Sequence, residues 1–319
     1  MTSMERTYTG CILTLCALLF QVACASSSEQ PPGEAWPTDD STYVFSEPDA
    51  EFTLTVDLEE ISGLTFMEDG MLGAIQDEDG DLFIIDPSSG EIVEVRNFGE
   101  AGDYEGVELA NSVLYILRSD GTVFMFENLS AAEIDGREVQ YDVPGRCDAE
   151  GIAYQRSLDR ILIVCKEHPG KGYRGKKAIY AFGPTSGEPS PSPAYLLEID
   201  DFEYNVEEHP FNEAIRSMLS DRIDMSGFKP SGLAVHPRTG ELFVLSGVTK
   251  ALLRLDDTGA VTAIWMLPVE LFDQPEGIAI NSNGDVYISN EAGDRKYATL
   301  LRFRERGSAI SDYSDDIPE

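Results

Sequence analysis

The chain has 319 residues, of which 58 are acidic and 23 are basic, so its formal net charge is −35 at pH 7. This charge excludes nucleic acid and makes an anionic membrane surface a poor partner for the body of the protein, whereas cations are favoured. The length allows one large all-β domain or two ordinary domains.

Residues 1–24 have the features of an export signal: Arg6 precedes an apolar stretch over residues 11–23, and small residues follow. Val22–Cys24 resembles a bacterial lipobox, with Gln21 where leucine is usual. We therefore expect lipidation at Cys24, and cleavage by ordinary signal peptidase is the alternative. The lipid would anchor the protein in the cell envelope, in the periplasm or at the outer membrane, through a flexible tether over residues 25–42. No later apolar run approaches the roughly 20 residues of a membrane span.

A short motif, Glu-Gly or Ser-Gly followed by an aliphatic residue, recurs five times: Ser62–Leu64, Glu105–Val107, Glu150–Ile152, Ser231–Leu233 and Glu276–Ile278. Three of the intervals are about 45 residues long, which is the length of a four-stranded blade, and one interval of about 80 contains an insertion. The sequence therefore predicts an all-β fold, a five-bladed β-propeller over residues 43–306. Six blades are the less favoured alternative, and residues 307–319 form an acidic tail.

Each repeat contains four alternating segments that indicate strands, except the last repeat, which has three. The spare segment at residues 51–58 would supply the missing strand and close the ring, leaving no open edge. The insertion contains a Pro/Ser-rich stretch at residues 184–193. It also contains one short predicted helix at residues 212–223, which would cover one face of the ring or fill a gap between blades.

Cys147 and Cys165 flank one predicted hairpin, and an exported protein can form disulfides. If Tyr154 pairs with Ile161, Cys165 lies opposite Glu150 and Cys147 lies about 10 Å away. A disulfide then requires the chain to fold back before the strand. The sequence therefore leaves two alternatives for these cysteines: a disulfide, or two buried free thiols.

In a propeller blade, the innermost strand begins and the second strand ends at the same end of the central channel. The motif glutamates should therefore meet the residues that end the second strands, among them Glu167 and Asn290, at one mouth. Crowded carboxylates repel one another unless a cation or shared protons relieve them, and ligand sets made only of oxygen atoms indicate calcium. The predicted metal ligands are the acidic residues of this mouth: Glu60, Asp77, Glu78, Glu105, Glu150, Glu276 and Glu291.

A structural role for the same motif is the alternative. Each glycine would permit close packing near the axis, and each glutamate would cap backbone amides or bind the neighbouring blade.

The segment at residues 170–177 approximates a phosphate-binding loop, but Lys177 stands where serine or threonine is required, and a strand rather than a helix follows. The positive charge of this region is nevertheless concentrated, and it would lie at the same mouth. We expect His168, Lys171 and Arg174 to hold a small anionic ligand beside a metal, with a solvated hairpin loop as the alternative.

Five stretches carry a family resemblance: "EISGLTF", "DYEGVEL", "DAEGIAY", "KPSGLAVHPRTGELFVLSG" and "QPEGIAINSNGDVYISNE". In their order and variation, over residues 50–305, they resemble the SdiA-regulated, or YjiK/CarP-like, β-propeller family. The resemblance implies an exported or envelope-associated protein linked to calcium, with a looser similarity to β-propeller phytases and calcium-dependent lactonases. In the second repeat, "RSDGT" departs from the acidic strand end that the pattern leads us to expect.

Two functional hypotheses follow. The first is a lipid-anchored, calcium-binding propeller that acts as a binding or scaffold module in the cell envelope. The second is a calcium-dependent hydrolase of a phosphate ester or lactone, in which metal-bound water is the nucleophile. A purely structural ring for protein interaction is a third possibility, because propellers host unrelated functions.

Overall fold

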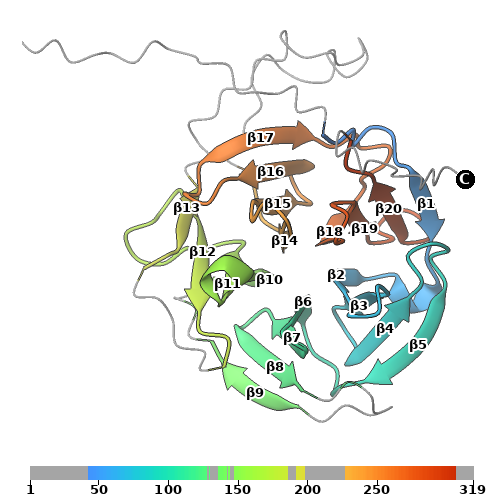
Figure 1. Cartoon of the computed structure of the whole chain (residues 1–319), viewed down its shortest axis with the longest axis horizontal. Helices are drawn as coiled ribbons and strands as arrows, with labels where there is room; N and C mark the ends of the chain where they lie inside the picture. The colour runs from blue at the N-terminus through green and yellow to red at the C-terminus, as the bar shows by residue number, and fades with distance from the viewer. Residues whose placement is uncertain are drawn as a thin grey trace, which may run out of the picture. The chain divides into compact units, whose positions relative to one another are not determined.

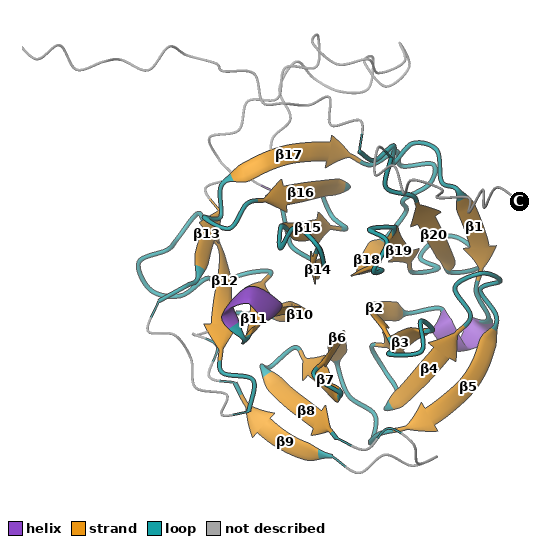
Figure 2. Ribbon diagram, in the orientation of Figure 1, coloured by secondary structure: helices purple, strands orange, loops and turns teal. Residues whose placement is uncertain are grey.

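The computed structural model describes residues 42–127, 129, 136–141, 143, 147–185, 192–197 and 227–306. Five four-stranded antiparallel sheets stand around a common axis, as the strands of Figure 1 show. Apart from two 3-10 turns, the regular structure of the described residues is β (Figure 2). The predicted five-bladed propeller is confirmed.

The first three blades follow the chain from the axis outward. The first blade consists of β2 (Ile61–Phe66), β3 (Leu72–Gln76), β4 (Asp81–Ile85) and β5 (Ile92–Asn97). The second consists of β6 (Tyr104–Ala110), β7 (Val113–Arg118), β8 (Thr122–Phe126) and β9 (Arg137–Gln140). The third consists of β10 (Ala149–Gln155), β11 (Arg160–Cys165), β12 (Lys177–Phe182) and β13 (Tyr195–Leu197). The fourth blade consists of β14 (Gly232–Val235), β15 (Leu242–Ser246), β16 (Ala251–Leu255) and β17 (Val261–Met266). The fifth consists of β18 (Pro275–Ile280), β19 (Val286–Asn290), β20 (Thr299–Phe303) and β1 (Ala50–Thr53). The 3-10 turns are η1 (Val56–Leu58) and η2 (Arg156–Leu158).

The hydrophobic cores lie between neighbouring blades. Leu162 and Val164 of β11, for example, pack in one cluster with Leu242 and Val244 of β15. Because a blade covers each face of such a strand, both of its faces are apolar, and β3 is buried along its whole length. The outer strand β5, in contrast, is largely exposed. This arrangement explains why the second strand of each repeat is a continuous apolar run.

The N-terminal strand β1 pairs antiparallel with β20, from Ala50 opposite Arg302 to Thr53 opposite Thr299. It therefore supplies the fourth strand of the last blade, as predicted. Just before it, Tyr43 and Phe45 are buried against Trp265 of β17. The start of the described chain thus ties the fourth blade to the fifth.

The disulfide that the sequence left open is present: Cys147 and Cys165 are bonded, with their Cα atoms 4.8 Å apart. Tyr154 does pair with Ile161, but an irregularity between Ala149 and Gly151 places Ala149, not Glu150, opposite Cys165. The expected pairing of Cys165 is therefore wrong by one residue. Asp148 turns the chain back with a φ of 53°, a left-handed conformation that aspartate tolerates better than most residues.

Several predicted segments lie outside the described residues: the export signal and Cys24, nearly all of the tether, the helix at residues 212–223 and the acidic tail. Among the residues that are described, no helix has the length and apolar character needed to cross a bilayer.

Candidate functional site

The five motif glycines form a closed ring of inter-blade contacts around the axis. A Cβ atom on Gly106 would lie 3.1 Å from the backbone nitrogen of Ile152, and one on Gly277 would lie 3.3 Å from the carbonyl carbon of Gly63. Backbone from the next blade occupies the space that a side chain would need. The packing role considered for these glycines is therefore present, and the channel they line encloses a cavity of only about 10 Å³.

In four of the five blades, the motif residue before the glycine sits at an irregularity of the inner strand. Strand pairing shifts between Ile61 and Gly63, between Tyr104 and Gly106, between Ala149 and Gly151, and between Pro275 and Ile278. A bulge leaves its extra residue out of the ladder and redirects that residue's side chain. The repeated bulges thus explain why the motif side chains leave the regular alternation of the strand.

In two blades the motif side chain is a serine that binds the next blade. Ser62 Oγ donates to the carbonyl oxygen of Tyr104 at 2.7 Å, and Ser231 Oγ donates to that of Pro275 at 2.9 Å. Each acceptor is the residue just before the next motif acid. These two positions therefore have a structural role in joining blades.

In the third blade, Glu150 is buried and paired with a lysine. Lys166 Nζ donates to Glu150 Oε1 at 2.7 Å. Burial raises the pKa of Glu150 to about 7, although the lysine opposes this shift. Burial alone would lower the pKa of Lys166, but Glu150, with further contributions from Glu276 and Glu105, raises it above its ordinary value. Lys166 is thus an internal counter-ion for several carboxylates.

Sequence reasoning missed Lys166. It directly follows the second strand of its blade, the position that Asp77 and Glu291 occupy in the first and last blades. The available signal was a basic residue at a strand end where two other blades have an acidic residue.

Three carboxylates gather on the side of the mouth formed by the first and last blades. We call Asp77, Glu276 and Glu291 the acid side. Burial raises the pKa of Glu276 to about 7 and that of Asp77 to about 6. Burial, with the charges of Glu276, Glu60 and Asp77, raises the pKa of Glu291 to about 8.

The acid side contains one unsatisfied acceptor. Asp77 Oδ1 is buried and has no hydrogen-bond partner among the described residues. Glu291 Oε2, in contrast, accepts a hydrogen bond of 2.6 Å from Gln274 Nε2. Buried polar atoms in folded proteins normally have a partner, so the Asp77 oxygen marks a place where a proton donor or a cation would be favourable.

The second blade differs from the others, as its sequence indicated. Ser119 takes the strand-end position, and its hydroxyl donates to the carboxylate of Asp103. The motif acid there is Glu105, whose pKa is raised to about 9 by burial and then by the charges of Glu150 and Asp103. The carboxyl of Glu105 therefore holds its proton at neutral pH.

The structure brings Asp77, Glu105, Glu150, Glu276 and Glu291 into electrostatic contact at one mouth. The other two predicted ligands, Glu60 and Glu78, are exposed and influence Asp77 by charge. Within the described part of the chain, no three His, Cys, Asp or Glu residues are grouped closely enough to hold a metal ion. The mouth is therefore an acidic cluster with a partial internal counter-ion.

The predicted anion-binding residues His168, Lys171 and Arg174 lie in the connection between β11 and β12, at the mouth end, and all three are exposed. His168 lines an open cavity of about 520 Å³ whose other lining residues are Ser119, Asp120, Val143, Cys147, Asp148 and Glu167. Three carboxylates in this lining make it a poor match for an anion. Lys171 and Arg174 are not among the residues that line this cavity.

Glu108 is a further, half-buried acid that sequence reasoning missed. Burial raises its pKa to about 8, and the carboxylate accepts a hydrogen bond from the backbone N–H of Tyr154 in the next blade. One blade earlier, Thr65 Oγ1 accepts a hydrogen bond of 3.1 Å from the backbone N–H of Leu109. Glu108 therefore contributes to inter-blade bonding.

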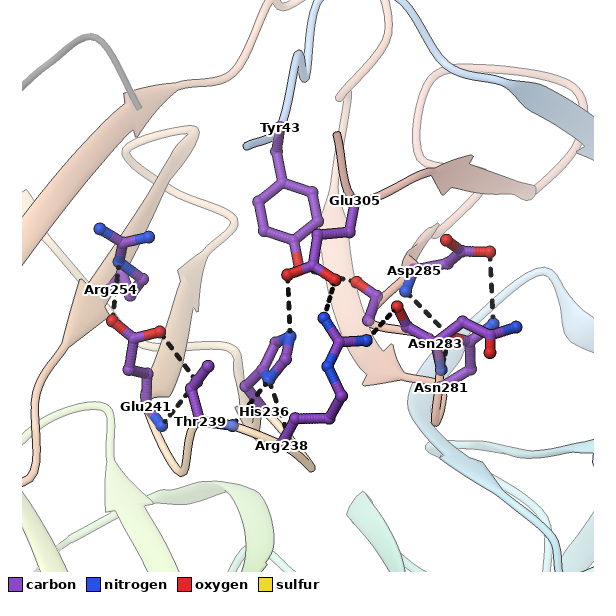
Figure 3. Close-up of polar contacts among 11 residues, drawn as sticks. Tyr43, His236, Arg238, Thr239, Glu241, Arg254, Asn281, Asn283, Asp285 and Glu305 are labelled. Atoms are coloured by element: carbon purple, nitrogen blue, oxygen red, sulfur yellow. Dashed lines mark hydrogen bonds and ion pairs between the residues drawn. The ribbon is translucent and has the colours of Figure 1, made fainter. Parts of the chain in front are cut away.

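A second polar cluster lies at the end of the ring opposite the mouth (Figure 3). Tyr43 Oη donates to the carbonyl oxygen of Gly284 at 2.7 Å, and Arg238 forms an ion pair with Glu305. The ring of His236 is buried, with Nδ1 accepting from backbone N–H groups and Nε2 3.7 Å from Glu305 Oε1. This cluster joins the N-terminal segment to the fourth and fifth blades and has a structural role.

A sequence model described as SdiA-regulated matches residues 51–293 of the chain. No curated protein matches its sequence. Among solved structures, the chain is similar to glutaminyl cyclase from Myxococcus xanthus, with a TM-score of 0.54 and 14% identity over 81% of this chain and 95% of that one. It is also similar to the PQQ-bound aldose sugar dehydrogenase from Streptomyces coelicolor, with a TM-score of 0.51 and 14% identity over 81% and 97% of the two chains. At this identity the likeness shows a shared fold alone.

Proposed function

The chain belongs to the SdiA-regulated family, and from that premise we propose that it is an exported, lipid-anchored binding module of the cell envelope whose acidic channel mouth binds a cation. The observation that carries this proposal is the acid side, where Asp77, Glu276 and Glu291 are crowded without a directly bonded basic side chain among the described residues. Their pKa values are raised by burial and by one another's charges, so these carboxyls bind protons more readily than exposed acids do. A bound cation can replace those protons.

Calcium is the cation that we propose first. Carboxylate oxygens are its preferred donors, and the unsatisfied Asp77 Oδ1 is a suitable one. The donor atoms fit calcium well, whereas their arrangement fits in part, because no three acidic groups of the described residues lie close enough to hold the ion without moving. Asp77, Glu276 and Glu291, with Glu60 beside them, would hold the ion, and Glu150 would stay paired with Lys166. The ion would supply the positive charge that fixes these carboxylates in place.

Two features support export. The N-terminal segment has the pattern of a lipoprotein signal ending at Cys24, and the disulfide between Cys147 and Cys165 suits an oxidising compartment. The propeller would then be held at the membrane by its N-terminal lipid.

Thermal unfolding of the full chain with calcium and with a chelator tests the cation site. A ligand that binds the native state alone raises the midpoint as its concentration rises, so we expect an increase in millimolar calcium. Asp77→Asn and Glu291→Gln should abolish the increase. Asp79→Asn, at an exposed position close in sequence, is the matched control. A midpoint that calcium does not move would remove calcium from the proposal.

A calcium-dependent hydrolase of a phosphate ester or lactone is the second candidate. The observation that favours it is the open cavity of about 520 Å³ beside His168, which has the size of a small-molecule site. His168, which lines this cavity, would contact the anionic substrate, and calcium held by the lining carboxylates Asp120, Asp148 and Glu167 would offset their charge. Calcium-dependent turnover of p-nitrophenyl phosphate or of a simple lactone, lost in His168→Ala, would support this candidate, and absence of turnover for both would reject it.

A further inference from the structure

Four large apolar side chains are exposed at the mouth end of the ring. Val56 is 67% exposed, Val248 62%, Val269 53% and Tyr297 46%. All four lie in segments that connect strands at this end: before β2, after β15, before β18 and after β19. We call these four residues the apolar arc.

Hydrogen bonds join the segments that carry the apolar arc. Leu267 N donates to Lys250 O at 2.7 Å, which links the segments of Val248 and Val269. Arg295 Nη2 donates to Glu270 O at 2.5 Å, which links those of Val269 and Tyr297. Leu54 N donates to Ala298 O at 2.9 Å, which links Tyr297 to the segment of Val56. The segments that carry the four side chains are therefore joined to one another, on the fourth, fifth and first blades.

The apolar arc borders the acid side directly. A Cβ atom on Gly247, the residue before Val248, would lie 2.9 Å from Glu276 Oε1. Glu291 is bonded to Gln274, which lies in the same connection as Val269. Exposed apolar side chains grouped on adjoining segments beside an acidic cluster are typical of an interaction site rather than of residues scattered singly over the surface.

We propose that the apolar arc and the acid side together form a docking surface for a polypeptide segment in which a lysine or arginine is flanked by apolar side chains. The cationic group enters the mouth beside Glu276 and Glu291, and the flanking side chains contact Val269 and Tyr297. This inference rests on the proposed cation-binding role of the mouth and names the partner for it. The net charge of −35 favours a basic partner throughout.

Lys166 supports the choice of a side-chain cation. Its ammonium is already held at this mouth by a 2.7 Å hydrogen bond to Glu150, and the charges of Glu276 and Glu105 stabilise it. The ring is thus built to accept a primary ammonium on one side. A metal ion alone would leave the apolar arc without a role, whereas a peptide uses both features.

The test is fluorescence anisotropy of the full chain with a panel of labelled heptapeptides that carry a central lysine or arginine between apolar residues. Two matched panels replace the central residue by glutamate or the apolar residues by serine. We expect members of the first panel to bind at least about tenfold more tightly than their matched peptides. The double variant Val269→Ser, Tyr297→Ser should weaken binding about tenfold. Val93→Ser, which removes a comparably exposed valine from β5, should leave it unchanged.

Three results would overturn the inference: no binding by the first panel, equal binding of the glutamate panel, or equal binding by the double variant. If the unchanged protein binds phosphatidylcholine vesicles, the double variant does not, and no peptide binds, the surface would be assigned to a membrane and the inference would also be rejected. The calcium-dependent midpoint separates the two proposals. If peptides bind but calcium does not raise the unfolding midpoint, only the calcium site is rejected. If calcium raises the midpoint but no peptide binds, only the docking surface is rejected.

Discussion

The ammonium of Lys166 donates a 2.7 Å hydrogen bond to the carboxylate of Glu150, which is buried where the third blade begins at the channel mouth. The two residues come from the second and innermost strands of one blade, and the bulge at Glu150 turns its side chain out of the strand ladder. The positive charge of Lys166 thus stabilises the ionised form of the acidic cluster, which would otherwise bind more protons.

Replacing Lys166 by methionine should destabilise the protein by about 3 kcal/mol, because it leaves a buried carboxylate without its partner. Urea unfolding monitored by tyrosine and tryptophan fluorescence measures this loss. Adding Glu150→Gln to the variant should recover part of it. Lys171→Met, at an exposed position, should change the unfolding free energy by less than about 0.5 kcal/mol. An equal effect of both lysine substitutions would show that the ion pair does not stabilise the fold.

The acid side should make the protein more stable as the pH is lowered from 8 towards 5.5. The pKa of Glu291 is raised to about 8 and that of Glu276 to about 7, whereas glutamate in an unfolded chain titrates near about 4.3. The folded state therefore binds more protons, and this stabilisation is lost as the pH rises through the folded values. Melting temperatures across this range measure the slope, which Glu291→Gln should reduce. A slope that Glu291→Gln leaves unchanged would place the titrating groups elsewhere.

Tyr43→Ala should destabilise the protein by about 3 to 5 kcal/mol, because it removes a buried ring packed edge-to-face on Phe243 and Trp265. Tyr43→Phe keeps the ring and loses the hydrogen bond to Gly284, so it should cost about 1 kcal/mol. Denaturant unfolding compares the two variants. If Tyr43→Ala costs no more than Tyr43→Phe, the N-terminal segment does not tie the blades together.

Gly151→Ala should severely reduce folding, since its Cβ would lie 2.8 Å from the backbone nitrogen of Leu233 in the next blade. That contact can be relieved only by moving one blade relative to another. Gly227→Ala is the control because, its chain neighbours aside, no atom of the described residues lies within 4 Å of the added Cβ. Soluble yield and melting temperature should fall for the first variant and stay unchanged for the second. Normal stability of Gly151→Ala would contradict the glycine ring.

Much of the fold could be predicted from the repeat, because the five Gly motifs and the missing strand of the last repeat are properties of local pattern. The chain ends were predictable too, since an incomplete last blade and a spare segment at residues 51–58 leave one natural pairing, although the strand itself is shorter, Ala50–Thr53. The pairing of Cys165 could not be predicted, because it depends on a bulge at Glu150 and on the left-handed backbone conformation of Asp148, and the repeat pattern reveals neither.

The candidate site divides in the same way. From the sequence alone came the convergence of the motif acids on one mouth, since strand direction determines at which end each residue lies. Only the tertiary structure decided that Ser62 and Ser231 bond neighbouring blades, that Lys166 neutralises Glu150, and that Asp77 Oδ1 has no partner in the described residues. The physical reason is that a repeat specifies its own strands and turns, whereas the charge balance at the axis depends on side chains from all five blades, which lie far apart in the chain and meet only when the ring closes.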